Sequence, residues 1–394
     1  MRGPRPAGRS ARALTTLLVL VLVVAGCASG RGRAPATTAV ASATSTVPSS
    51  EQTTATTATT GPGAGCALPP LRRQLAQLLV VGFDSTTASP ATLALVRQGI
   101  GGVILFGRNI TGADQVRDLV VDLQAAAPTR LAVGVDQEPG TRVARLRGLV
   151  PASPSARALG RRPAEQVYRQ AVRLGQALKD LGITVDYAPV LDVTGDGGVI
   201  GDRAFGADPA VVARAGIAFE RGLKDAGVMP VGKHFPGHGA TGADSHKGLP
   251  VIDTSLARLE ARDMAPFEAA VKAGLPAVMV GHLLVRDLDP ERPASLSPAA
   301  IRLLRGKLGF DGLVVTDALE MGAIADGWGL PEAGELALEA GVDQLLIGLP
   351  DPPVEAVLDR LEAAVTAGRL PRGRVAEAFA RVQVAKGERR WASC

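Results

Sequence analysis

The stretch GLVVTDAL, residues 312–319, places three branched apolar residues and a threonine before an aspartate. Similar apolar, β-branched runs recur along the chain, at residues 78–83, 101–107, 131–137, 183–193, 229–235, 277–284 and 343–349. Runs that are apolar on both faces are typical of parallel strands covered by helices. Helical patterns lie between them, at residues 113–127, 164–182 and 209–227.

Eight strand-and-helix units in one domain match the count of a closed (β/α)8 barrel. The alternative is an open, doubly wound sheet. No Gly-x-Gly-x-x-Gly pattern opens a helix after the first strand, which argues against the dinucleotide-binding version of that sheet. We therefore predict an α/β fold, a single (β/α)8 TIM-type barrel that forms a catalytic domain over residues 66–394.

Residues 1–26 have the features of a bacterial lipoprotein signal peptide. Four arginines and no acidic residue precede an apolar run at residues 13–26 that is too short to span a bilayer. The stretch VVAGC resembles a lipobox, which implies cleavage before Cys27 and lipidation of that cysteine. An ordinary signal peptide that is cut elsewhere is the alternative. We expect an exported protein, lipid-anchored to the outer face of the cytoplasmic membrane.

Residues 27–65 consist of the lipidated cysteine and a segment made almost wholly of Ala, Thr, Ser, Gly and Pro. Such a composition predicts a disordered stalk. The net charge of +5 falls to +1 without the four arginines of residues 1–26, and aromatic residues make up 3% of the chain. We therefore expect no nucleic-acid partner.

Cys66 and Cys394 stand at the two ends of the predicted barrel. In an exported protein such a pair either forms a disulfide or remains as two free thiols, and the sequence leaves both open.

Polar residues follow the apolar runs at their carboxyl ends, where the active sites of such barrels lie. DQEPG follows the third run and VIGDRAF the fourth, while KHFPGHGATGADSH, residues 233–246, begins within the fifth. The sixth run contains His282 and the seventh contains Asp317. Three of the four histidines of the chain fall in residues 233–246.

Two other interpretations of this histidine-rich stretch remain. His234 and His238 are four residues apart, but Pro236 and Gly237 lie between them and argue against a helical zinc pair. A metal site built from loop residues His246 and Asp244 is one alternative, and a purely structural loop is the other. Burying so many polar groups without partners would be costly.

In order along residues 68–390, these motifs resemble those of glycoside hydrolase family 3 β-N-acetylglucosaminidases, the bacterial NagZ-type β-hexosaminidases. The resemblance rests on DQE with a downstream RVAR, APVLDV, IGDRAF, KHFPGHG, DSH and VVTDALEMGA. It implies a retaining glycosidase with Asp317 as nucleophile, His246 as general acid/base and Asp244 as the partner of His246. Imidazole titrates near neutral pH, and a carboxylate on its second nitrogen raises its basicity, which suits this role.

The local pattern by itself suggests a different role for Asp317. An aspartate followed three residues later by Glu320 suits a helix N-cap. The resemblance to the nucleophile segment of the family favours the catalytic role instead, and Glu320 is expected to be a capping or surface residue.

The resemblance also implies substrate contacts from Asp136, Lys233, His234, Arg203 and Arg145. At Arg145 the chain departs from the family pattern, because DQEPGTRVAR has a proline in place of a glycine and one extra residue. Arg142 is therefore the competing choice. His238 is expected to stabilise its loop, and neither a cofactor nor a metal is implied.

Together these features predict an exo-acting enzyme that removes non-reducing terminal β-linked N-acetylglucosamine from peptidoglycan fragments. A phosphorylase with the same site is the alternative, because a histidine acid/base would not repel phosphate as a carboxylate would. A non-catalytic sugar-binding lipoprotein is a further alternative.

Overall fold

The computed structural model describes residues 67–195, 197–349, 353–388 and Trp391. The predictions for the signal peptide (residues 1–26), for Cys27 and the stalk (residues 27–65), and for Cys66 and Cys394 therefore concern residues outside the described part.

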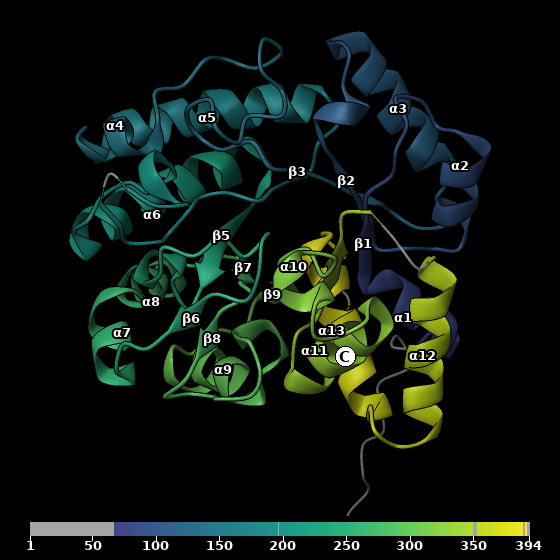
Figure 1. Ribbon diagram of the computed structural model, residues 1–394. Coiled ribbons are helices and arrows are strands. Elements are labelled where there is room, and N and C mark those ends of the chain that lie inside the picture. Colours follow the sequence, from purple (N-terminus) through teal and green to yellow (C-terminus); the bar gives the residue numbers. More distant parts are fainter. Residues whose placement is uncertain (1–66, 196, 350–352, 389–390, 392–394) are drawn as a thin grey trace, which may run out of the picture. The chain divides into compact units, whose positions relative to one another are not determined.

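Eight parallel strands form a nearly closed barrel, as predicted. Their order in the sheet is β10-β1-β2-β3-β4-β5-β7-β9, and an isolated parallel bridge between Val315 and Gln344 brings the chain just before β10 beside β9. In Figure 1 the strands lie in the middle with the helices around them. The strands are β1 (Leu79–Val81), β2 (Gly102–Leu105), β3 (Ala132–Val135), β4 (Val185–Asp186), β5 (Met229–Phe235), β7 (Ala277–Val280), β9 (Leu313–Thr316) and β10 (Leu345–Ile347).

The helices follow the strands around the barrel. They are α1 (Leu71–Gln77), α2 (Pro90–Arg97), α3 (Ala113–Ala126), α4 (Ala156–Gly160), α5 (Ala164–Asp180), α6 (Pro209–Ala226), α7 (Leu256–Arg262), α8 (Ala265–Lys272), α9 (Pro298–Arg302), α10 (Gly322–Ala325), α11 (Leu330–Ala340), α12 (Val354–Thr366) and α13 (Arg372–Ala385). Short 3-10 turns lie at Gly107–Asn109, Gly201–Arg203, His238–Ala240 and Ala294–Leu296, and a π-helical turn at Leu303–Lys307.

Helix α6 shows how the sequence sets these elements. Asp208 caps its first turn by accepting a hydrogen bond from the Ala210 amide, and Pro209 occupies the first helical position. Gly227 ends the helix at a φ of 89°, a conformation that favours glycine. Its buried stripe, spaced three and four residues apart as a helix face requires, includes Val212, Ala215, Phe219 and Leu223.

The predicted run at residues 183–193 is a strand only at Val185–Asp186. Pro189 has no backbone N–H to donate, which interrupts the ladder. Pairing with β5 resumes as a single bridge between Val190 and Lys233. This bridge lies close to the polar residues at the end of β5.

A second sheet was not predicted. It pairs β6 (Val251–Ile252) with β8 (Leu284–Val285) in parallel, just beyond the polar ends of β5 and β7. Two-residue strands carry no alternating pattern that a sequence could reveal.

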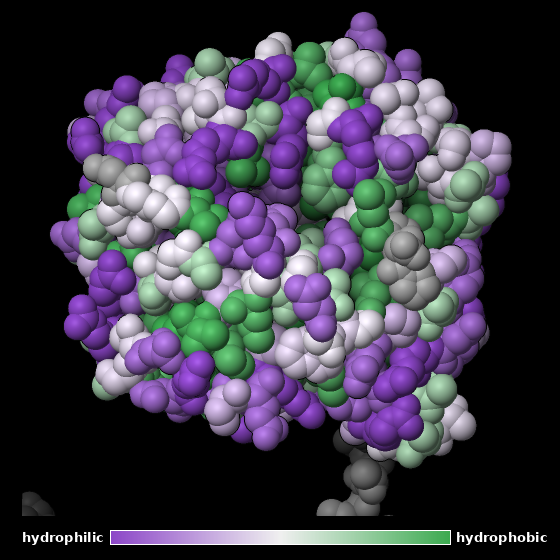
Figure 2. All heavy atoms as spheres, viewed as in Figure 1, coloured by the Kyte–Doolittle hydropathy of each residue, from purple (hydrophilic) through white to green (hydrophobic). Residues whose placement is uncertain are grey.

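In the described part of the chain, no helix combines the length and apolar character that crossing a membrane would need. Figure 2 shows hydrophilic and hydrophobic side chains interspersed over the side of the molecule that it displays.

Candidate active site

One pocket lies at the carboxyl ends of the barrel strands. Asp136 directly follows β3, Lys233 and His234 lie in the last part of β5, and Asp317 directly follows β9. The pocket brings together all of the predicted catalytic and sugar-binding residues except Asp244. Asp244 does not line the pocket but contacts His246, which does. Its lining residues are Ile104, Phe106, Asp136, Val143, Arg145, Val199, Ile200, Arg203, Lys233, His234, His238, Ser245, His246, Met279, Asp317, Ala318, Met321 and Leu346.

A buried ion-pair network forms one side of the pocket. The Lys233 ammonium, 2% exposed, lies 2.7 Å from Asp136 Oδ1 and 2.8 Å from Glu138 Oε1. Arg203 donates two hydrogen bonds to the same Glu138, from Nε at 2.7 Å and from Nη2 at 2.8 Å. Glu138 thus binds both Lys233 and Arg203, the two cations predicted to contact the sugar, and fixes their positions.

The charges in this network stabilise one another. Burial raises the pKa of Glu138, but Lys233 and Arg203 outweigh it and lower the pKa to about 2. Burial lowers the pKa of Lys233, while Asp136 and Glu138 raise it above its usual value. Glu138, Lys233 and Arg203 are therefore ionised at neutral pH, and the network holds Asp136 and the two cations in fixed positions for a ligand.

Another carboxyl group near this network, that of Asp186, differs from Glu138 in the direction of its pKa shift. Asp186 is fully buried; its Oδ1 accepts the Gln137 amide at 3.0 Å, and its Oδ2 has no hydrogen-bond partner. Burial raises its pKa well above the usual value. Burial therefore favours the neutral form of Asp186, whereas Lys233 and Arg203 favour the charged form of Glu138.

His234 is oriented by Asp192. The Asp192 Oδ2 atom lies 2.7 Å from His234 Nδ1, and Asp192 Oδ1 accepts the backbone amides of His234 at 3.2 Å and His238 at 2.7 Å. With Nδ1 bound to a carboxylate, His234 presents Nε2 as its free ring nitrogen. Asp192 fixes both the ring and the start of the following loop.

His246 and Asp244 form the predicted pair. Their Nδ1 and Oδ1 atoms are 3.1 Å apart, and the same oxygen accepts the His246 amide at 3.0 Å. The His246 amide is the largest contribution that lowers the pKa of Asp244 below its usual value. The His246 side chain is 73% exposed, in contrast to the buried residues around it.

Asp317 projects its carboxylate into the pocket from the end of β9. Its Oδ1 accepts the Ala318 amide at 2.8 Å. Burial raises the pKa of Asp317, but His234, His282, the Ala318 amide and Lys233 together lower it below the usual value. Lys233 is a cation throughout the neutral range, whereas burial lowers the pKa of His282 and leaves that ring neutral.

The structure corrects the local interpretation of this segment. The next helix, α10, begins only at Gly322 and its N-cap position is Met321, without a side-chain cap, so Asp317 is not a helix cap. Glu320 is neither a cap nor a freely exposed residue. It is part-buried, and its Oε2 accepts the Gly348 amide at 2.9 Å, which ties the segment to the end of β10.

The two competing arginines differ in position. Arg145 lines the pocket with Nη2 4.0 Å from Asp136 Oδ2, and its guanidinium lies 5.7 Å from the centre of the Phe106 ring. Arg142 is not among the lining residues; it pairs with Asp202 at 3.6 Å and donates to the Val199 carbonyl at 3.2 Å. The geometry favours Arg145 as the ligand contact.

Sequence reasoning assigned no role to Glu138, Asp192 and His282, although each lies in or beside a motif at a strand end. His282 is fully buried, with Nδ1 2.8 Å from Ser295 Oγ and Nε2 2.9 Å from the Ala318 carbonyl. Their position at the ends of apolar runs could have pointed to them. A charged or imidazole group that is buried there needs a hydrogen-bonding partner.

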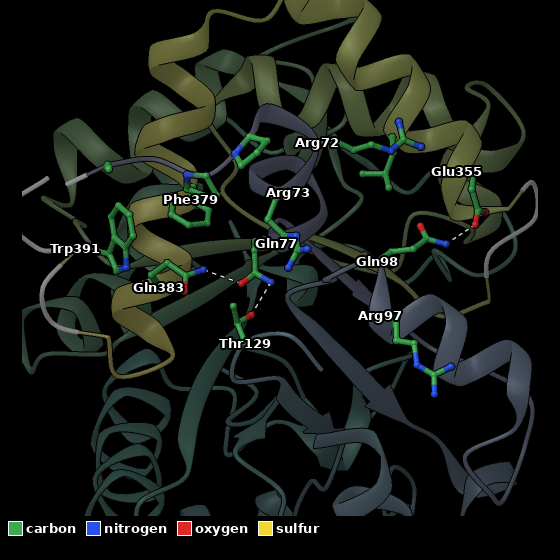
Figure 3. A pocket seen from close by; sticks show the side chains of 14 residues that line it. Arg72, Arg73, Gln77, Arg97, Gln98, Thr129, Glu355, Phe379, Gln383 and Trp391 are labelled. Atoms are coloured by element: carbon green, nitrogen blue, oxygen red, sulfur yellow. Dashed lines mark hydrogen bonds between the residues drawn. The ribbon is translucent and has the colours of Figure 1, made fainter. Parts of the chain in front are cut away.

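A larger pocket lies at the amino ends of β1, β2 and β3 (Figure 3). Its floor is Gln77, which accepts from Gln383 at 2.8 Å and donates to Thr129 at 3.2 Å. None of the predicted catalytic or sugar-binding residues lines it. Ala67 and Trp391, the described residues nearest to Cys66 and Cys394, both do.

Among the described residues, no cluster of three His, Cys, Asp or Glu side chains has the arrangement of a metal site.

Residues 70–385 match the family model for the N-terminal domain of glycosyl hydrolase family 3. The chain is 44% identical to a Mycobacterium tuberculosis protein named beta-hexosaminidase LpqI, over 80% of this chain and 82% of that one. It is 39% identical to a beta-hexosaminidase of Thiobacillus denitrificans, over 67% and 75% of the two chains.

Solved structures agree with these matches. A family 3 β-N-acetylglucosaminidase from Paenibacillus superposes with a TM-score of 0.79 at 39% identity, over 83% of this chain and 63% of that one, so this chain spans less than two thirds of that protein. A family 3 glycosyl hydrolase from Mycobacterium smegmatis gives a TM-score of 0.75 at 44% identity, over 82% and 98% of the chains. The resemblance inferred from the motifs is confirmed.

Proposed function

We propose that this chain, which belongs to glycosyl hydrolase family 3 and is a glycoside hydrolase of the β-N-acetylhexosaminidase class, removes terminal β-linked N-acetylglucosamine from peptidoglycan fragments with retention. The observation that carries the mechanism is one pocket that holds an ionised carboxylate, Asp317, together with the ring of His246. The names of the relatives support the amino sugar, and the exported, membrane-anchored location expected from the sequence supports the cell-wall source.

Asp317 acts as the nucleophile. Its carboxylate attacks the anomeric carbon of the terminal sugar and forms an ester, while the bond from that carbon to the glycosidic oxygen breaks. The attack requires an ionised carboxylate, and the lowered pKa of Asp317 supplies one. The Ala318 amide occupies Oδ1 and fixes the carboxylate's orientation.

His246 transfers the protons. In the first step its imidazolium gives the Nε2 proton to the departing glycosidic oxygen. In the second, Nε2 takes a proton from the water that attacks the ester, which releases the sugar and the Asp317 carboxylate. Asp244 on Nδ1 stabilises the imidazolium that is present before the first step and forms again in the second, while the ring is neutral in the glycosyl-enzyme.

The remaining pocket residues bind the sugar. Asp136 accepts from hydroxyl groups, and Lys233, Arg203 and Arg145 donate to hydroxyl and carbonyl oxygens. His234 contributes through Nε2, since Asp192 occupies Nδ1. Glu138 keeps Lys233 and Arg203 in place and has no contact with the sugar in this proposal.

The experiment compares the purified protein with Asp317→Asn on a chromogenic β-N-acetylglucosaminide, with and without phosphate. Asn keeps the shape of the side chain but cannot form the ester, so turnover should fall by about 10³-fold or more. Asp326→Asn, at an exposed position after α10, is the matched control and should leave turnover unchanged.

The products distinguish the alternatives. Free N-acetylglucosamine in both buffers supports the hydrolase, sugar phosphate identifies a phosphorylase, and no product identifies a binding protein. A 2-fluoro glycoside should label Asp317 in the native enzyme. An active Asp317→Asn enzyme would overturn the assignment of Asp317 as the nucleophile. Absence of label, together with no turnover of substrates that lack the acetamido group, would assign the nucleophile to the substrate's own acetamido group instead.

A further inference from the structure

Ser245 lies between the two residues of the proposed acid/base pair, and its environment is the opposite of theirs. Ser245 is 4% exposed, whereas the side chains of Asp244 and His246 are 28% and 73% exposed. The ring of His246 has its hydrogen bond to Asp244, two residues away in the same loop. This contact orients the ring within the loop but does not place the loop over Asp317.

The side chain of Ser245 meets His238. A hydrogen bond of 3.3 Å joins His238 Nε2 and Ser245 Oγ, and His238 is 3% exposed. His238 is itself held: its amide donates to Asp192 Oδ1 at 2.7 Å, and its ring lies edge-on to His234 at 5.8 Å. Burial lowers the pKa of His238, so a neutral ring is present at working pH.

The backbone of Ser245 meets the segment that follows Asp317. The Ala323 amide, in the first turn of α10, donates to the Ser245 carbonyl at 3.0 Å. The two hydrogen bonds that tie residues 242–248 to His238 and to α10 therefore both end on Ser245. One comes from the β5 side of the pocket and the other from the nucleophile's own segment.

Gly322 makes room for this contact. A Cβ on Gly322 would stand 2.9 Å from the His246 carbonyl oxygen and 3.6 Å from the Gly248 amide nitrogen. Its φ lies outside the left-handed region, so the backbone itself would accept alanine. What requires glycine here is the close approach of the loop.

We propose that His238 and Gly322 are positioning residues that clamp Ser245 and so hold His246 in proton-transfer range of the glycosidic oxygen. The inference rests on the proposed role of His246. His238 does not touch the sugar's reacting atoms; it acts through Ser245. Because α10 begins five residues after Asp317, the clamp also couples the position of the acid/base to that of the nucleophile.

The test measures turnover of aryl β-N-acetylglucosaminides with good and poor leaving groups. A poor leaving group needs the proton of His246, whereas an activated phenol leaves with little help. His238→Ala and Ser245→Ala should each lower turnover of the poor substrate by about tenfold or more, and of the good one by about twofold or less. In a His246→Ala background, neither should have a further effect, because residues that act through one group are not additive.

Gly322→Ala separates positioning from folding. The φ of Gly322 lies outside the left-handed region, so its own backbone accepts alanine, and the strain falls on the contact with the His246 carbonyl. The variant should show the same leaving-group-dependent loss, because the new methyl displaces His246. Gly373→Ala in α13, where a Cβ meets no atom within 4 Å, is the matched control and should change neither activity nor leaving-group dependence.

Equal losses on both substrates, full additivity with His246→Ala, or an unaffected Gly322→Ala enzyme would each overturn the clamp. If His246→Ala itself shows no leaving-group dependence, the proposed mechanism fails instead. If His246→Ala behaves as expected and the clamp variants do not, the mechanism stands and the clamp is rejected.

Discussion

Glu138→Gln should destabilise the protein strongly, although Glu138 has no proposed contact with the substrate. The side chain is 1% exposed and pairs with Lys233 at 2.8 Å and with Arg203 at 2.7 Å. The amide keeps the shape but loses the charge, and it turns an NH2 group toward one of the two cations. Breaking a buried ion pair by removing one partner typically costs about 3–5 kcal/mol.

The pKa gives an independent magnitude. A carboxyl whose pKa falls from an ordinary 4.5 to about 2 on folding contributes about 3 kcal/mol of stability at neutral pH, at 1.36 kcal/mol for each unit. The unfolded chain binds the proton more readily, so this contribution is fully present above pH 4.5 and is lost as the pH falls toward 2. This value matches the lower end of the cost of breaking a buried ion pair.

Urea unfolding followed by circular dichroism at pH 7, 5 and 3 measures the effect. Glu138→Gln should be less stable than the native protein by about 3–5 kcal/mol at pH 7. The difference should narrow by about 2 kcal/mol between pH 5 and pH 3. Asp186→Asn is the matched control: it makes the same carboxyl-to-amide change at a buried residue whose pKa is raised by burial, which favours the neutral form. It should be as stable as the native protein at pH 7, or more so.

A small stability loss for Glu138→Gln, or a loss that does not depend on pH, would show that the charge of Glu138 does not stabilise the fold. So would an equal destabilisation by Asp186→Asn, because the effect would then come from packing and not from charge.

Three further predictions concern the sugar contact and the chain ends. Arg145→Ala should raise KM by about 10- to 150-fold, as loss of one charged hydrogen bond costs about 1.5–3 kcal/mol, while Arg142→Ala changes KM little; the reverse result would reassign the contact. Cys27→Ala should release the protein from the membrane fraction or leave it unprocessed, and unchanged fractionation would exclude lipidation there. Cys66 and Cys394 should form a disulfide, because their nearest described neighbours line one pocket; two free thiols in the non-reduced mass spectrum would contradict it.

The barrel could be predicted because its strands are buried on both faces. Each of the eight apolar runs corresponds to a strand, since a parallel sheet covered by helices requires apolar residues at successive positions. The short length of β4 and the second sheet could not be predicted, because both depend on local backbone features. Pro189 shortens β4, and β6 and β8 are too short to carry a pattern.

The site could be predicted in part for a related reason. The strand ends locate Asp136, Lys233, His234 and Asp317 in one region whatever the loop conformations, because parallel strands end at the same edge. The partner of each group depends on side-chain directions that no local pattern encodes. Whether Lys233 pairs with Asp317 or with Glu138 was therefore not evident from the sequence, and the structure shows the latter pairing.

This difference in pairing changes how the pocket works. A lysine bound directly to the nucleophile would have to give up that contact when the sugar enters. Lys233 instead keeps Asp136 and Glu138 as partners and acts on Asp317 through its charge at longer range. The network can therefore keep Asp317 ionised before it attacks the sugar and again after the ester is hydrolysed, without rearranging at any step. Proton transfer is left to His246, the more exposed residue of the acid/base pair, and in our proposal its position depends on Ser245.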